Sequence, residues 1–111
     1  MLTEAMGPVK YAAIAASSNG DNTIVAAVEG YKIRVLGYVM VGAGAVNAFW
    51  QSAAAGDVLS GTMAIAAAGG KIEAALNGLG HFETNKGELL NLNLSGAVAV
   101  AGHLTYQLVK G

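Results

Sequence analysis

Turn-forming residues recur at short intervals along the whole chain, and this spacing constrains the fold more than any other feature of the sequence. Glycine, asparagine, aspartate and serine favour tight turns because they adopt, or hydrogen-bond to, turn backbone. They gather at residues 17–22, 29–30, 42–44, 56–57, 69–70, 77–80, 85–87 and 95–96. The segments between these turns have the length of β-strands. The spacing therefore predicts an all-β chain.

Alternation of apolar and polar side chains within these segments supports the prediction. Leu90, Leu92 and Leu94 share one face of an extended segment, since successive side chains of a strand point to opposite faces. The residues on the opposite face are Asn91, Asn93 and Ser95. We expect this strand to be half-buried, with Asn91 solvated. Alternation resumes over residues 98–108, and we expect the two strands to pair as a hairpin.

Further strands are predicted at residues 11–16, 23–28, 31–41, 45–51 and 59–65. In the third of these segments, apolar Leu36, Tyr38 and Met40 alternate with a second apolar row, so we expect both faces of its second half to be covered. The alanine-rich run 61–76 is compatible with a helix or with strands, but Gly69 and Gly70 would break a helix there.

About eight short strands with frequent turns and no helical periodicity predict one β-sandwich or jelly-roll-like domain of antiparallel strands. A chain of 111 residues encloses a single hydrophobic core. We place this domain at residues 9–111 and a short N-terminal arm at residues 1–8, which ends at Pro8. The arm has no basic or apolar stretch typical of a secretory signal, so synthesis in the cytoplasm is expected.

Charge is scarce in this sequence. Charged residues form 12% of the chain and hydrophobic residues 54%, with a formal net charge of −1. This balance offers no field that would attract nucleic acid or an anionic membrane, so neither is an expected partner. A monomer of this size normally covers its surface with charged side chains. We therefore expect other chains to cover apolar outer faces of the sheets, such as the rows containing Ala99 and Tyr38.

Candidate chemistry is sparse. His81, Glu83 and His103 could form a small metal or acid–base set if the sheet brought them together, and Glu83 and Glu88 flank one predicted turn. No metal-binding or nucleophile motif accompanies these residues, and there is no cysteine. They are interpreted as surface or turn residues. We expect no enzymatic activity, no metal and no cofactor.

Two other features have a possible binding function and a simpler structural explanation. Residues 42–47 begin like a dinucleotide-binding loop, but no strand-then-helix unit surrounds them, so a hairpin loop is predicted. Trp50 and the four tyrosines could stack on sugars or bases. They are scattered among apolar strands, which favours core or subunit contacts.

Several segments resemble a family of short virion proteins of tailed phages. The segments that carry the resemblance are GDNTIV (20–25), KIRVL (32–36), FETNKGE (82–88), LNLNLS (90–95) and AVAVAGHLTY (97–106). The resemblance runs from about Lys10 to the C-terminus. It implies a β-sandwich that decorates or cements the phage head, as a homotrimer on the lattice of the major capsid protein. It implies no catalytic residues, and it places the protein on the outer surface of the virion.

Contacts with other chains are predicted from apolar side chains. The predicted interface residues are Leu2, Met6, Tyr38, Met40 and Trp50. Leu2 and Met6 would let the arm clamp a neighbouring subunit or the capsid protein. The alternative function is a carbohydrate- or receptor-binding module of a tail or head fibre, which predicts an exposed aromatic platform. Exposure of Trp50 would distinguish the two functions.

Overall fold

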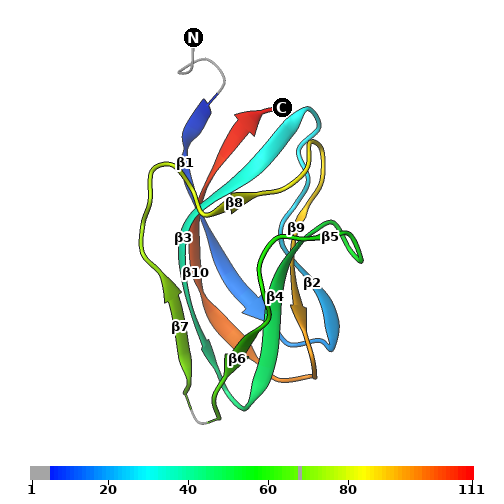
Figure 1. Ribbon diagram of the computed structural model, residues 1–111, viewed down its shortest axis with the longest axis vertical. Coiled ribbons are helices and arrows are strands. Elements are labelled where there is room, and N and C mark those ends of the chain that lie inside the picture. The colour runs from blue at the N-terminus through cyan, green and yellow to red at the C-terminus, as the bar shows by residue number, and fades with distance from the viewer. Residues whose placement is uncertain (1–5, 68) are drawn as a thin grey trace.

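The computed structural model describes residues 6–67 and 69–111, which form two antiparallel sheets packed face to face (Figure 1). The strands are β1 (Met6–Ala16), β2 (Gly20–Val25), β3 (Tyr31–Gly42), β4 (Val46–Ser52), β5 (Asp57–Val58), β6 (Met63–Ile65), β7 (Lys71–Ala74), β8 (Phe82–Glu83), β9 (Leu90–Leu94) and β10 (Val100–Lys110). Within these residues there is no helix of a length and hydropathy that would span a bilayer.

The strand order is that of a jelly roll. One sheet, which we call sheet A, has the order β1-β10-β3-β7, and β8 also pairs with β3. The other, sheet B, has the order β2-β9-β4-β5, and β6 also pairs with β4. The short strands β7 and β8 share one position beside β3, and β5 and β6 share one beside β4. The all-β sandwich prediction is thus confirmed, with eight strand positions of which two are split.

Two predicted hairpins are wrong, because consecutive strands lie in different sheets. Strand β9 pairs with β2 and β4, whereas β10 pairs with β1 and β3. Residues 43–45 likewise cross from β3 in sheet A to β4 in sheet B. In both arrangements the apolar side chains face the core, so alternation predicts the strand but not its partner.

A β-bulge in β3 accounts for the two apolar rows in this strand. Gly37 lies opposite Thr105 and Val35 opposite Tyr106, so Leu36 is an extra residue between the two pairs. Before the bulge, the side chains that face the core are those of odd-numbered residues. After the bulge, they are those of even-numbered residues. Before it Val35 is buried, and after it Met40 is buried. Within the single chain the outer side of this second half stays partly open, since Val41 is 41% exposed.

The core lies between the two sheets and contains an aromatic cluster. Trp50 of β4 is fully buried, and its ring centroid lies 5.2 Å from that of Tyr38 and 6.1 Å from that of Phe82. The three leucines of β9 are also buried against this cluster, as predicted. The residues that complete the core include Ile14, Ile33, Val35, Met40, Ala48, Val100 and Leu104.

Strand β1 begins at Met6, within the segment predicted as an arm. Met6 lies opposite Val109 of β10, and the register shifts between Met6 and Val9. Pro8 falls in this shift on an edge strand, where its missing N–H costs no ladder bond. Residues 1–5, including Leu2, lie outside the described residues, as does the Met6 side chain. In the alanine-rich run, the described residues form β6 and β7 rather than a helix.

Candidate interaction surface

The outer face of sheet A carries several exposed apolar side chains. Tyr11 is 77% exposed and Val9 is 48% exposed, and both project outward from β1 because Ile14 of the same strand projects inward. Small side chains of β10 and β3 continue the surface. We call it the apolar face, and its residues are Val9, Tyr11, Ala13, Ala15, Val39, Val41 and Ala101.

The cross-strand register fixes how these side chains are arranged. Ala13, His103, Val39 and Glu73 form one row across β1, β10, β3 and β7. The charged pair Lys71 and Glu73 lies at the β7 margin of the face, with 3.6 Å between Nζ and Oε1. The centre of the face therefore holds no lysine, arginine or carboxylate side chain.

A hollow of about 230 Å³ opens on this face between β10, β3 and the end of β7. Its lining residues are Gly37, Tyr38, Val39, Glu73, Ala74, Ala75, Leu76, His103 and Thr105. Gly37 is needed at its base, because a Cβ atom there would lie 3.1 Å from the Ala74 oxygen and 3.1 Å from the Leu76 Cα. The absent side chain lets the segment after β7 fold close over β3.

The outer face of sheet B is polar and bonded to itself. Asn91 Nδ2 donates to Asp21 Oδ1 at 2.9 Å and to Gln51 Oε1 at 2.8 Å. Asn93 Nδ2 donates to the same Asp21 oxygen at 3.0 Å. These bonds tie β2, β9 and β4 together. The expectation that Asn91 is solvated is wrong: it is 1% exposed, because Asp21 and Gln51 provide partners that permit burial.

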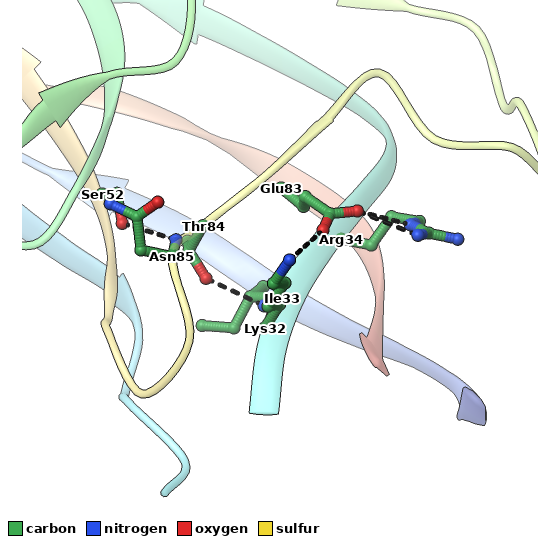
Figure 2. A network of polar contacts seen from close by, with 7 residues as sticks. All are labelled: Lys32, Ile33, Arg34, Ser52, Glu83, Thr84 and Asn85. Carbon is green, nitrogen blue, oxygen red and sulfur yellow. Dashed lines mark hydrogen bonds and ion pairs between the residues drawn. The ribbon is translucent and has the colours of Figure 1, made fainter. Parts of the chain in front are cut away.

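A second polar network joins the two sheets at one end of the sandwich (Figure 2). The Thr84 hydroxyl accepts a hydrogen bond from the Ile33 amide at 2.9 Å, and the Thr84 amide donates to the Ile33 carbonyl at 3.0 Å. Next along the chain, the Asn85 amide donates to the Ser52 hydroxyl at 2.9 Å. That hydroxyl donates to Glu88 at 2.7 Å. Buried Ser52 and Thr84 therefore link the end of β4 to β3.

Glu83 lies between two cations on the outer side of β3 (Figure 2). Arg34 donates to its Oε1 atom from Nε at 3.1 Å and from Nη2 at 2.9 Å, and Lys32 Nζ lies 3.3 Å from Oε2. Partial burial alone would raise the pKa of Glu83. The hydrogen bonds and positive charges of Arg34 and Lys32 together outweigh burial and hold this pKa below its ordinary value. Lys32 and Arg34 thus form ion pairs at the sheet surface.

The structure does not bring the candidate chemical residues together. His81 Nε2 lies 2.7 Å from the Ala75 carbonyl oxygen, Glu83 is paired with Arg34, and Glu88 accepts from Ser52. His103 lines the hollow. No three histidine or carboxylate side chains are grouped as metal ligands in the part of the chain that the structure describes.

The predicted interface residues that the structure describes lie mainly in the core. Met40 and Trp50 are fully buried, and half-buried Tyr38 packs against Trp50. Folding of one chain explains their burial, and neither Met40 nor Trp50 is accessible to a partner. The predicted outer row of Leu36, Tyr38 and Met40 is corrected in the same way. After the bulge Tyr38 and Met40 face the core, and Leu36 at the bulge is also buried.

Sequence reasoning did not single out Tyr11 or the hollow. The sequence did contain a signal for Tyr11. It lies three residues before Ile14, and side chains an odd number of residues apart in a strand point to opposite faces. The hollow depends on the register between β3 and β7, which has no local signal in the sequence.

Comparisons of the chain with models of protein families, with curated protein sequences and with solved structures find no match.

Proposed function

We propose that this protein is a structural subunit of a tailed-phage virion, without enzymatic activity, that decorates or cements the capsid. In this proposal it binds the major capsid protein at the outer surface of the particle as a homo-oligomer, with three copies the expected number. The virion assignment depends on the sequence resemblance. The observation that carries the structural role is the exposed apolar face of sheet A.

The surface is unusually poor in charge for its area. The accessible surface is 5656 Å², close to the roughly 5700 Å² expected of a compact monomer of this mass. Its 13 charged residues therefore have about 435 Å² each, whereas a typical domain of this length would have about 200 Å² for each. Such a surface is expected of a chain whose working state is an assembly, because neighbours cover the apolar part.

The alternative is a carbohydrate- or receptor-binding module, which requires an aromatic platform open to solvent. Trp50, the main candidate for that platform, is buried in the core. The exposed aromatic of the apolar face is the single residue Tyr11, which lies opposite Thr105, and one ring does not make the platform of several aromatics that stacks on a sugar. The arrangement favours a protein partner.

Two measurements test this proposal. Sedimentation velocity at micromolar concentration should give the mass of a homo-oligomer, and capsid shells that lack the protein should bind it in a saturable way on co-sedimentation. A stable monomer would overturn the homo-oligomeric subunit, and failure to bind such shells would overturn the capsid role. The control is Val58→Ser, which removes an exposed apolar side chain from sheet B and should leave both results unchanged.

A further inference from the structure

Tyr11 and the hollow lie in one cross-strand row of the apolar face. Tyr11 of β1 is opposite Thr105 of β10, and Thr105 is opposite Gly37 of β3 at the base of the hollow. An exposed aromatic ring therefore stands at the β1 side of the face, and an opening stands at its β3 and β7 side. About 10 Å of sheet separates the two strands that carry them, so a chain does not fill its own hollow.

We infer that Tyr11 of one copy inserts into the hollow of a second copy of this chain. The inference rests on the homo-oligomer of the proposed function and assigns its subunit contact. Each copy has one tyrosine and one hollow at different places on the same face. Because both features lie on one face, two copies with these faces opposed across a two-fold axis place each tyrosine in the other copy's hollow, so this contact gives a pair rather than the ring of three that the resemblance implies.

The volume of the hollow suits a phenol ring. Apolar cavities of about 150 Å³ bind benzene, and this opening has about 230 Å³. Part of its wall is apolar, with Val39, Ala74 and Leu76 placed to contact the ring. Removing a ring that is 77% exposed from water would stabilise the contact by the hydrophobic effect.

The polar groups of the hollow suit the hydroxyl end of the same side chain. Glu73 and His103 both line the opening, on opposite sides of Val39 in one row. A carboxylate oxygen or a neutral imidazole nitrogen accepts a hydrogen bond from a phenol O–H. The hollow therefore offers an apolar wall and an acceptor, which is the combination that a tyrosine requires when it is buried.

The charge distribution also fits a second copy. Lys71 and Glu73 at the margin already neutralise one another, so a neighbour approaching the face meets no net charge there. Small side chains such as Ala13 and Ala101 let a second backbone come close. On β1 and β10 the face carries no lysine, arginine or carboxylate side chain, and the charges in the row of Val9 belong to Arg34 and Glu83, which pair with one another.

The first test is photochemical. Tyr11 is replaced by p-azidophenylalanine, which keeps the ring, in a mixture of ordinary and ¹⁵N-labelled chains. After irradiation and trypsin digestion, we expect the crosslink in the peptide 72–86, which follows Lys71 and ends at Lys86 and contains the rim residues Glu73 to Leu76. Mixed isotopes in the product show that the crosslink joins two chains.

The second test uses variants of surface residues, followed by sedimentation velocity and thermal melting. Tyr11→Ser removes the ring, and Ala75→Trp fills the hollow. We expect each to weaken self-association at least tenfold with the melting temperature of the dissociated chain unchanged, while Val58→Ser, also an exposed apolar position, has no effect. Mixing the first two variants should give a heterodimer, because one keeps the hollow and the other keeps the tyrosine.

The outcomes separate this inference from the proposed function. A crosslink to none of the residues that line the hollow, or a Tyr11→Ser variant that associates like the wild type, overturns the tyrosine contact and leaves the structural subunit standing. A wild-type monomer overturns both. Crosslinking within 72–86 together with weakened association of both variants supports the contact.

Discussion

Replacement of Asn91 by alanine tests whether the polar face of sheet B holds the fold together. The side chain is 1% exposed and donates to Asp21 at 2.9 Å and to Gln51 at 2.8 Å. A hydrogen bond to a charged group contributes about 1.5–3 kcal/mol and a neutral one about 0.5–1.5 kcal/mol. Asp21 is exposed, so the lower part of the first range applies.

The variant also changes which buried atoms lack partners. Asn91 Oδ1 has no hydrogen-bond partner among the described residues. Removing this buried polar atom is favourable and offsets part of the stability lost with the two hydrogen bonds. Buried Gln51 would lose the donor to its Oε1 atom, which adds a cost of about 1–3 kcal/mol if water cannot reach it. We therefore expect Asn91→Ala to lower the free energy of unfolding by about 2–3 kcal/mol.

The assay is equilibrium unfolding in urea at one fixed protein concentration, since association would otherwise shift the midpoint. The matched control is Asn93→Ala, which removes one 3.0 Å bond to the same Asp21 from a half-buried position and should cost about 0.5–1 kcal/mol. Adding Gln51→Ala to Asn91→Ala should show a coupling of at least about 1 kcal/mol. Equal losses for the two asparagines, or no coupling, would refute the network argument.

Three further expectations concern other parts of the sandwich. Leu92→Ala should cost about 2–5 kcal/mol in the same urea assay, because the side chain is fully buried; a loss below 1 kcal/mol would contradict its place in the core. Gly102→Ala should cost about 3 kcal/mol or prevent folding, because its Cβ would meet the Val39 oxygen, whereas Gly96→Ala meets nothing within 4 Å and should be near neutral; similar midpoints for both would contradict this packing. Glu83→Gln should cost about 1 kcal/mol at pH 7. Its folded pKa lies below the ordinary value of 4.5, so the stabilisation is present above that pH and is lost as the pH falls through the folded pKa. The gap between wild type and variant should therefore narrow as the pH falls below 4.5, and a constant gap would count against the ion pair as its cause.

The positions of most strands were predictable because alternation and turns are local properties. The buried faces of β9 and β10 follow from the parity of their side chains alone. Strand partners did not follow, because a leucine face meets the core equally well in a hairpin or in a sandwich of two sheets. The bulge that changes which side chains of β3 face the core was not predicted either. The extra residue Leu36 can be recognised only when β3 is aligned with β10.

Residues of the candidate surface were harder to predict than the fold. Asn91 looks solvated until Asp21 and Gln51, distant in sequence, are placed beside it. The hollow requires Gly37 to meet the segment after β7, and that approach depends on pairing between strands far apart in the chain. Conversely, Trp50 looks like a contact residue because an aromatic in an apolar strand suits either a core or an interface.

The position of β10 between β1 and β3 affects how the protein is made. Strand β1 is synthesised first but has no neighbour in its own sheet until β10 has been added. Pairing of strands so distant in sequence is slow, because a long loop must close before any contact forms. During most of its synthesis, the chain therefore contains β1 and β3 without the strand that pairs with both of them. Chains that stop before β10 lack the strand that pairs with both, and such products should be readily degraded by proteases.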